Sequence, residues 1–256
     1  MTVLDLFRLD GKVALVTGAS RGLGQGIAVG LAEAGADIAG LDRTPDCNET
    51  CVQVEALGRR YFNLSIDLLN ATPEDLTRAV EQVVEGLGRI DILVNNAGII
   101  RRAPALDYSV ADWDEVININ LRAVFFLSQA AGRVMAAQGS GKIINVASML
   151  SFQGGILVPS YTASKSAVAG LTRALANEWS PLGINVNAIA PGYMATDNTA
   201  PLRADAVRSE AILARIPAGD WGTPDDLKGA VVYLASDAAR YVHGAILPVD
   251  GGWLAR

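Results

Sequence analysis

The sequence predicts an α/β fold with one doubly wound parallel sheet that is covered by helices on both faces. Three observations indicate this. Short apolar runs alternate with helix-length amphipathic stretches along all 256 residues, as in right-handed strand–helix–strand units. The apolar runs are continuous, which is typical of strands buried on both faces. No proline- or serine-rich linker interrupts the chain, and ~250 residues is an ordinary size for one such domain. We therefore expect a single domain over residues 1–256.

The first half of the chain is predicted to contain four strands with helices between them. The strands are short runs of branched and other apolar residues, and the helices carry apolar residues at helical spacing. In chain order the elements are strand 13–16, a helix that includes 27–34, strand 36–41, helix 47–57, strand 61–66, helix 73–87 and strand 90–94. Pro73 fits the first turn of its helix, where no backbone N–H is needed.

The second half continues the alternation, which brings the expected sheet to about seven strands. The same patterns predict helix 111–137, strand 142–146, helix 161–178, strand 184–189, helix 224–235 and strand 245–249. Residues 191–222 are the exception, because prolines and glycines recur along them. Long irregular segments in compact domains are often lids or binding loops. We expect this segment to be a substrate loop or lid.

The composition excludes several classes of function. Half of the residues are hydrophobic and 19% are charged, which fits a folded protein with a large core rather than disorder. The net charge of −6 makes nucleic acid or an anionic membrane a poor partner. His243, Cys47 and Cys51 are the only histidine and cysteines, so a Cys₂His₂ zinc site cannot form and no metal site is expected. The two cysteines are expected to be unreactive thiols in a reducing compartment.

No targeting or membrane segment is expected. The first ten residues carry three charged side chains and no apolar core, unlike a signal peptide. The uncharged span 143–164 is long enough to cross a bilayer, but it contains polar side chains, glycine and proline, which do not suit hydrocarbon. The expected location is the cytoplasm.

A glycine-rich loop follows the first predicted strand. Residues 17–24 read TGASRGLG, with Gly18, Gly22 and Gly24 at G-x-x-x-G-x-G spacing. The loop ends at the start of a helix, whose free N–H groups and dipole favour a phosphate. Glycine also lets the backbone approach that phosphate closely. The order of strand, turn and helix predicts a Rossmann-type dinucleotide site rather than a plain turn, and its further contacts are Ser20, Arg21 and Leu23.

Asp42 ends the second predicted strand, twenty residues after Gly22. An acidic residue there can accept both ribose hydroxyls of NAD and would repel the 2′-phosphate of NADP. Arg21 and Arg43 act in the opposite sense, since either guanidinium can pair with that phosphate. A simple helix cap at Asp42 is the alternative. We expect NAD as the cofactor, with NADP second.

Polar residues also follow the fourth predicted strand. Residues 95–98 read NNAG, and ligands bind at the carboxyl ends of parallel strands. Two amides and a glycine can pack against adenine and a neighbouring backbone, although an ordinary turn would have the same composition. We expect Asn95, Ala97 and Gly98 to contact the cofactor.

Ser148, Tyr161 and Lys165 form the clearest catalytic pattern. Ser148 follows the fifth strand, and Lys165 lies one helical turn after Tyr161 on the same face. A lysine ammonium at ~4 Å, with an effective dielectric constant of ~20, is worth ~4 kcal/mol, or about three pKa units on a tyrosine. The positive nicotinamide would add to this. The pair therefore predicts a tyrosine that exchanges protons near neutral pH, the alternative being an ordinary surface pair.

Together these motifs resemble the short-chain dehydrogenase/reductase superfamily over essentially the whole chain. The resemblance implies that Tyr161 is the general acid/base, that Lys165 holds the nicotinamide ribose, and that Ser148 bonds the substrate oxygen. Asn120, in NINL, matches the residue that supports a proton-relay water. The resemblance also assigns Asp67 to adenine and Pro191, Gly192 and Thr196, in PGYMAT, to the nicotinamide side. It further implies a homotetramer.

A closer resemblance is to one subfamily of these enzymes. The segments NVASMLSFQGGI, NAIAPGYMAT, RIPAG and VDGGWLAR resemble 2-dehydro-3-deoxy-D-gluconate 5-dehydrogenases, also described as 2-deoxy-D-gluconate 3-dehydrogenases. This implies an NAD-dependent oxidoreductase that interconverts a secondary alcohol and a ketone on a six-carbon sugar acid. The alternatives are an NADPH-dependent carbonyl or 3-oxoacyl-thioester reductase and a catalytically silent dinucleotide sensor.

Arginines are the expected readers of a sugar-acid carboxylate. Arg101 and Arg102 follow NNAG at the ligand edge of the sheet, and Arg203 lies in the predicted lid. A buried carboxylate needs a partner, and guanidinium can bind it with two hydrogen bonds. Of the two adjacent arginines, we expect one to reach the substrate and the other to face solvent or a neighbour. Gln153 is the further substrate residue, while His243 is expected to be a packed or exposed loop histidine.

Overall fold

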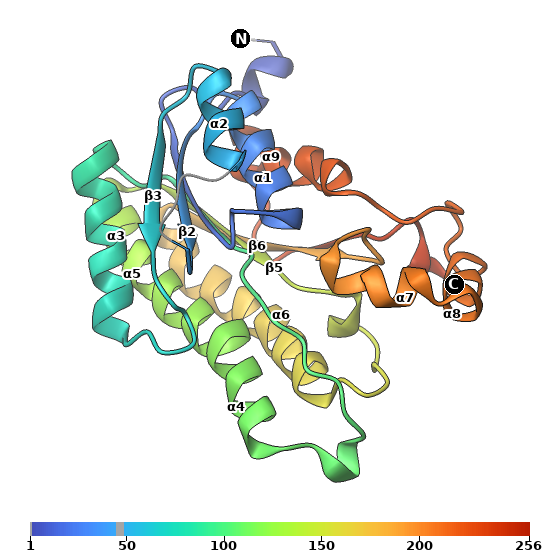
Figure 1. Cartoon of the computed structure of the whole chain (residues 1–256). Coiled ribbons are helices and arrows are strands. Elements are labelled where there is room, and N and C mark those ends of the chain that lie inside the picture. The colour runs from blue at the N-terminus through green and yellow to red at the C-terminus, as the bar shows by residue number, and fades with distance from the viewer. Residues whose placement is uncertain (1, 45–48) are drawn as a thin grey trace.

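Seven parallel strands form one sheet at the centre of the molecule (Figure 1). The computed structural model describes residues 2–44 and 49–256. The strand order is β3-β2-β1-β4-β5-β6-β7, which confirms the predicted doubly wound sheet. The strands are β1 (Val13–Thr17), β2 (Asp37–Asp42), β3 (Tyr61–Ser65), β4 (Ile92–Asn95), β5 (Gly141–Val146), β6 (Ile184–Pro191) and β7 (Ile246–Val249).

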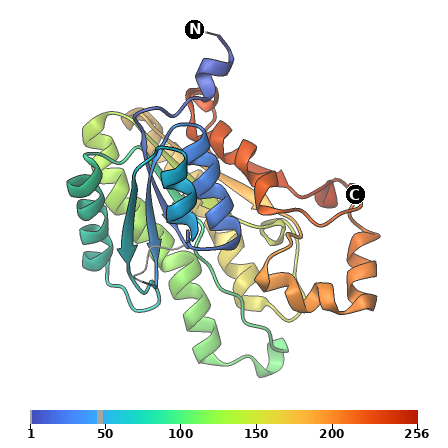
Figure 2. The same ribbon diagram turned by 45° about the horizontal axis from the view of Figure 1, so that its top comes forward.

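Helices cover both faces of the sheet, because the central strands are apolar on both sides. Leu15 of β1 packs into the layer formed by α3, α5 and α6, while its neighbours Ala14 and Val16 face α1, α2 and α9. Figure 2 shows these two layers on either side of the strands. The helices are α1 (Gly22–Glu33), α2 (Glu49–Ala56), α3 (Pro73–Leu87), α4 (Val110–Ile117), α5 (Ala123–Gln138), α6 (Pro159–Trp179), α7 (Ala200–Ala204), α8 (Ala206–Leu213) and α9 (Lys228–Ala235).

Local signals set the helix ends. Thr72 caps α3, accepting from the N–H of Asp75, whose carboxylate accepts from the N–H of Thr72 in return. Pro73 opens that helix, and Gly88 closes it in the left-handed conformation, which glycine adopts at little cost. The predicted bounds 73–87 therefore agree with the structure.

Two predicted segments differ from the structure. The single helix expected over 111–137 is divided by a turn of π-helix, η3 (Asn118–Arg122), between α4 and α5. The segment 191–222, expected to be irregular, contains the short helices α7 and α8. Figures 1 and 2 show both helices standing away from the sheet, beside the C-terminal end of the chain. Arg256 makes a hydrogen bond to the backbone of Ala214 there.

The structure bears on the expectations about cysteines, metal sites and membrane-spanning segments. Cys47 lies outside the described residues, and Cys51 is disulfide-bonded, not the free thiol that the sequence predicts. Within residues 2–44 and 49–256, no group of three or more histidine, cysteine or acidic residues is arranged to hold a metal ion. In that same part of the chain, no helix is both long and apolar enough to span a bilayer.

The fold brings the polar motifs to one edge of the sheet. Thr17, Asp42, Asn95 and Pro191 are the last residues of their strands, and Ser148 follows β5 by two positions. Because all seven strands are parallel, these ends lie on the same side. In the sheet, β1 is followed along the chain by β2 on one side, whereas β4 is followed by β5 on the other side. Ligands bind at such a switch point between neighbouring strands.

Candidate active site

The glycine loop between β1 and α1 has a backbone that favours glycine. Gly18 and Gly22 have φ angles of +64° and +57°, in the left-handed region that other residues rarely adopt. A Cβ on Gly24 would lie 1.9 Å from the carbonyl oxygen of Gly18. At Gly22 a Cβ would meet only a methyl group of Thr196 at 3.9 Å, so the N-terminus of α1 is open. The loop thus fits a diphosphate bound by helix N–H groups.

Asn96 fastens this loop to β4. Its Nδ2 donates to the carbonyl oxygens of Thr17 at 2.9 Å and Gly18 at 3.2 Å. In return, the N–H groups of Asn96 and Ala97 donate to the Thr17 hydroxyl at 3.0 and 2.9 Å. The NNAG turn and the glycine loop therefore form one rigid unit.

Asn95 has a different place from the one the sequence predicts. Its side chain is 3% exposed and donates to Ser128 Oγ at 3.0 Å and Asn145 Oδ1 at 2.8 Å. Asn145 in turn donates to Thr172. The expectation that both amides of NNAG face a ligand is wrong for the Asn95 side chain, because it joins β4 to β5 and to the helices behind them.

Asp42 is held by the glycine loop. Its Oδ2 accepts from the N–H of Ser20 at 3.1 Å and from the Ser20 hydroxyl at 2.5 Å, and its Oδ1 accepts from the N–H of Arg43 at 2.8 Å. The carboxylate is thus fixed at the end of β2, where the adenosine ribose of a dinucleotide lies in this fold.

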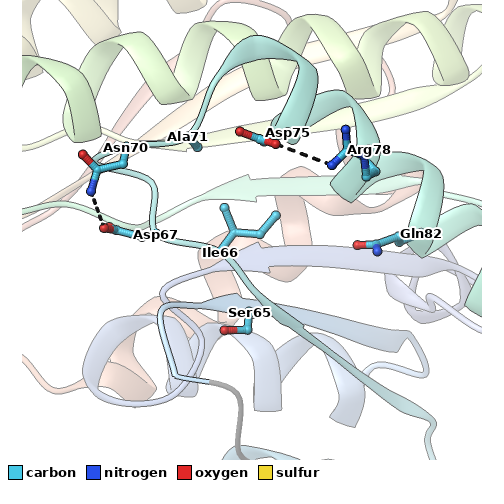
Figure 3. A pocket seen from close by; sticks show the side chains of 8 residues that line it. All are labelled: Ser65, Ile66, Asp67, Asn70, Ala71, Asp75, Arg78 and Gln82. Carbon is cyan, nitrogen blue, oxygen red and sulfur yellow. Dashed lines mark hydrogen bonds and ion pairs between the residues drawn. The ribbon is translucent and has the colours of Figure 1, made fainter.

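A hollow of about 390 Å³ adjoins Asp67, the residue that the family resemblance assigns to adenine (Figure 3). Asp67 accepts from the N–H of Leu69 at 3.1 Å and from Asn70 Nδ2 at 2.8 Å. Across the hollow, Arg78 lies 3.6 Å from Asp75 on α3. Figure 3 shows side chains from the end of β3 and from α3 around this space.

Tyr161, Lys165 and Ser148 come together at the start of α6. The Ser148 side chain is hydrogen-bonded to Tyr161, and Lys165 Nζ lies 5.7 Å from the centre of the tyrosine ring. Lys165 is 4% exposed and Ser148 7%. The ammonium donates to the carbonyl oxygen of Val146 at 2.6 Å, so the end of β5 fixes its direction.

The electrostatics of Tyr161 differ from the prediction. Burial raises the pKa of Tyr161 above its ordinary value, and the hydrogen bond from Ser148 and the charge of Arg102 lower that pKa by less. Burial also lowers the pKa of Lys165 to about 8. Within the chain, the pKa of Tyr161 is therefore shifted upward, opposite to the lowering expected from Lys165. The charge of Arg102 favours ionisation of the tyrosine, and the contribution expected from the nicotinamide charge stays a prediction.

Asn120 lies on η3, the π-helical turn. Its side chain is fully buried, accepts from the N–H of Ile99 and donates to the Ile99 carbonyl, both at 2.9 Å. It also donates to Ser164 at 3.3 Å, and Ser164 donates to the carbonyl of Tyr161 at 2.8 Å. A Cβ on Gly98 would lie 3.3 Å from Asn120 Oδ1 and 3.7 Å from Lys165 Nζ. Asn120 thus reaches the tyrosine helix and the NNAG turn together.

The turn after β6 faces the glycine loop. Gly192 packs against Asp250, whose Cα would lie 2.7 Å from a Cβ at that position. Thr196 caps the next helical turn, and its methyl group faces Gly22. Thr196 therefore lies beside the N-terminus of α1, and the assignment of Pro191, Gly192 and Thr196 to the nicotinamide side stays a prediction.

The two adjacent arginines point to different partners, as predicted. Arg101 donates to Glu115 Oε2 at 2.7 and 3.0 Å and lies 3.5 Å from Asp112. Arg102 donates to the carbonyl of Asn198 at 3.4 Å, and its charge acts on Tyr161. Arg101 is thus occupied by two carboxylates, whereas the charge of Arg102 lowers the pKa of Tyr161.

The other expected substrate residues belong to the outer part of the site. Arg203 donates to the carbonyl of Thr196 at 3.2 Å. Gln153 accepts from Arg215 at 3.4 Å. His243 contacts Ser180 and Asn185 instead; because Asn185 is near the start of β6, this histidine lies at the opposite edge of the sheet.

A family model described as enoyl-(acyl carrier protein) reductase matches residues 18–254. That span includes the three glycines of the loop and the residues Asn120, Ser148, Tyr161 and Lys165. The chain belongs to the short-chain dehydrogenase/reductase family. It is 60% identical to 2-dehydro-3-deoxy-D-gluconate 5-dehydrogenase from Escherichia coli strain K12, over 99% of this chain and 100% of the relative.

Solved structures of the family are similar throughout. One, described as a 2-deoxy-D-gluconate 3-dehydrogenase from Agrobacterium tumefaciens with bound NADP, is 57% identical with a TM-score of 0.91, covering 98% of this chain and 100% of that one. Another is a gluconate 5-dehydrogenase from Burkholderia cenocepacia in complex with NADP and tartrate. It is 40% identical with a TM-score of 0.94, and each chain is covered completely.

Within this short-chain dehydrogenase/reductase, sequence reasoning missed three side chains near the site. Asn96 is adjacent to the predicted Asn95, and Ser164 is one position before Lys165. The periodicity of the strand before Asn96 and of the helix that carries Ser164 was the sequence signal that could have identified them. Arg215 follows α8 and lies 4.0 Å above the ring of Trp253; no local motif predicts that contact, because it joins the segment 191–222 to the C-terminal end.

Proposed function

We propose that this chain is an NAD-dependent dehydrogenase of a six-carbon sugar acid, interconverting a secondary alcohol and a ketone as 2-dehydro-3-deoxy-D-gluconate 5-dehydrogenases do. The observation that carries the proposal is the cluster of Ser148, Tyr161 and Lys165, together with a guanidinium, Arg102, whose charge acts on the tyrosine. Close relatives with that printed activity cover the full chain. A nicotinamide cofactor, when bound, supplies the hydride acceptor or donor.

The chain's own residues then handle the proton and the substrate. The ionised oxygen of Tyr161 takes the proton from the substrate alcohol in oxidation, and the resulting hydroxyl returns that proton to the substrate oxygen in reduction. Ser148 shares a hydrogen bond with Tyr161 and holds the same substrate oxygen. Lys165, fixed by Val146, binds the nicotinamide ribose. Asn120 keeps the α6 backbone in place and supports a relay water. Such fixed positioning is a large part of enzymatic rate enhancement.

Arg102 is the residue that we assign to the substrate carboxylate. Its guanidinium acts electrostatically on Tyr161, and its hydrogen bond to Asn198 is long, at 3.4 Å. Arg203 and Gln153 are assigned to the outer part of the substrate. A carboxylate paired with Arg102 would be held beside the reacting hydroxyl.

A panel of substrates tests the proposal. Six-carbon aldonic and 2-keto-3-deoxy acids, with NAD and NADP, are compared with a neutral sugar alcohol and a 3-oxoacyl thioester by nicotinamide absorbance. We expect a sugar acid with NAD to have the highest kcat/KM. A higher value for the thioester with NADPH would establish the alternative reductase, and no turnover with any substrate would favour a silent sensor.

The reductase alternative has one observation in its favour, the description of the matching family model. A thioester reductase needs an apolar pocket without charge, whereas the charge of Arg102 acts on Tyr161. The sensor alternative would be favoured by a missing catalytic residue, but the cluster around Tyr161 is complete. We therefore place both below the sugar-acid dehydrogenase.

Replacing Arg102 with methionine is expected to lower kcat/KM for the acid about tenfold or more, because a charged hydrogen bond is worth ~1.5–3 kcal/mol. The measurement is the ratio of kcat/KM for the acid to that for its uncharged amide, in which any change at Tyr161 cancels. Arg101→Met is the matched control, since Arg101 is bound to Glu115 and Asp112. An equal loss in both variants would argue against the assignment.

The preference for NAD is part of the proposal, and Asp42 supports it. The structural relatives bind NADP, so the preference is a matter of degree. Asp42→Ala is expected to move the ratio of kcat/KM values at least about tenfold towards NADP, because a charged hydrogen bond to the ribose is lost. Asp42→Asn removes the negative charge but keeps an oxygen that can accept from Ser20. It therefore separates the effect of the charge from that of the Ser20 contact. If the parent already prefers NADP, the assignment is wrong.

We also propose a cytoplasmic homotetramer in which segment 191–222 acts as a lid. The family resemblance supports the tetramer, and Phe125 and Leu171 remain partly exposed on α5 and α6. Leu127 and Val168, on the same two helices, are buried within the chain and do not add to that surface. The lid is supported by its position beside Gly22 and Arg102.

A further inference from the structure

An ion pair joins the start of segment 191–222 to the glycine loop. Arg21 Nη1 donates to Asp197 Oδ2 at 3.2 Å, across 176 positions of sequence. Both side chains are 80% exposed, so the pair buries no apolar surface and makes little contribution to packing. Its location is the informative feature, because Thr196, the residue before Asp197, faces Gly22.

Arg21 is next to the group that reads the adenosine ribose. Ser20, the residue before it, donates two hydrogen bonds to the Asp42 carboxylate. Backbone connectivity therefore keeps Arg21 within a side chain's length of the ribose position. The guanidinium is nevertheless directed to Asp197 instead of that position.

NADP differs from NAD by a phosphate on this ribose. The phosphate needs a cation, and guanidinium binds it with two hydrogen bonds. Arg21 and Arg43 are the arginines that flank Asp42 and its loop. The backbone of Arg43 is hydrogen-bonded there, with its N–H donating to Asp42 and its carbonyl accepting from Ser65. Its guanidinium has no ion pair within the described part of the chain. Arg21, in contrast, is already paired.

We propose that Asp197 determines the choice between NAD and NADP by holding Arg21 away from the ribose 2′ position. The inference rests on the nucleotide site of the proposed function and adds a specificity residue on a different segment from Asp42. It also links cofactor choice to the lid. A 2′-phosphate that pairs with Arg21 releases Asp197, and with it one attachment of segment 191–222.

Asp197→Asn tests the proposal. Each cofactor is titrated alone by quenching of tryptophan fluorescence, and kcat/KM is measured separately. We expect the Kd for NADP to fall about threefold to fivefold with little change for NAD, since an exposed ion pair has an effect of this size. The change should shrink at high salt, which screens exposed charges. In the double variant Arg21→Met/Asp197→Asn the gain should disappear.

Asp220→Asn is the matched control. Asp220 lies in the same segment, is exposed, and has no hydrogen bond or ion pair within residues 2–44 and 49–256, so it changes only the net charge. An equal gain in both single variants, or none in Asp197→Asn, overturns the inference while the proposed function stands. A parent chain that binds neither cofactor overturns both.

Discussion

Tyr161→Phe is expected to lower kcat by ~10²–10⁴-fold, the usual contribution of a general acid/base, while cofactor binding stays close to that of the parent. The phenyl ring keeps its packing at the start of α6, but the hydroxyl that exchanges the substrate proton is lost. Lys165 keeps its bond to Val146, so the ribose contact that we assign to it remains.

The pH dependence gives a second readout of Tyr161. Burial holds the pKa of Tyr161 above its ordinary value, against the opposing influence of Ser148 and Arg102. A tyrosine must be deprotonated to accept a proton, so kcat/KM for alcohol oxidation by the parent should rise with pH toward that pKa. Any residual activity of the phenylalanine variant should lack this rise.

Steady-state kinetics and cofactor titration check this result, with Tyr241→Phe as the matched control. Tyr241 is 90% exposed, and loss of its hydroxyl should leave kcat unchanged. If Tyr161→Phe kept more than half of the parent kcat, Tyr161 would not be the proton carrier. A loss of cofactor binding equal to the loss of rate would indicate a structural role instead.

Gly24→Ala is expected to raise the Kd of the cofactor by about fivefold to a hundredfold, because overpacking of ~1–3 kcal/mol must be relieved by moving the loop. The added methyl would lie 1.9 Å from the Gly18 carbonyl oxygen and 2.5 Å from Asn96 Nδ2. Both neighbours are fixed, since Asn96 bonds the carbonyls of Thr17 and Gly18.

Thermal unfolding is measured beside the titration, so that a weakened fold is seen directly. Gly229→Ala is the matched control, because its Cβ would meet nothing within 4 Å. Alanine in a helix is favoured over glycine by up to ~1 kcal/mol, so this variant should bind cofactor normally and be equally or more stable. Cofactor affinity of Gly24→Ala within threefold of the parent would contradict the expected clash.

Local patterns in the sequence were sufficient for the sheet and for much of the site. All seven strands lie within two residues of the predicted bounds, because continuous apolar runs between polar turns have few other stable arrangements. The glycine spacing and the Tyr161–Lys165 spacing are also local, since one turn and one helix fix them. These features predicted the ligand edge before any tertiary contact was known.

Adjacent residues of the same type were not distinguished by these patterns. Asn95 and Asn96 have the same chemistry, yet one amide enters the core and the other fastens the glycine loop. Arg101 and Arg102 diverge in the same way, because only Arg101 faces the acidic residues of α4. Which neighbour takes which role depends on the side to which the backbone directs each side chain at the end of a strand or in a loop.

The sequence by itself determined the fold and the Tyr161–Lys165 pattern, because both depend on short-range periodicity or spacing, and the resemblance of its motifs indicated the family. The tertiary structure alone decided the sign of the Tyr161 pKa shift, the π-helical turn under Asn120 and the pairing of Arg21 with Asp197. Burial and ion pairing are set by groups distant along the chain, and their positions exist only once the sheet has brought the loops together.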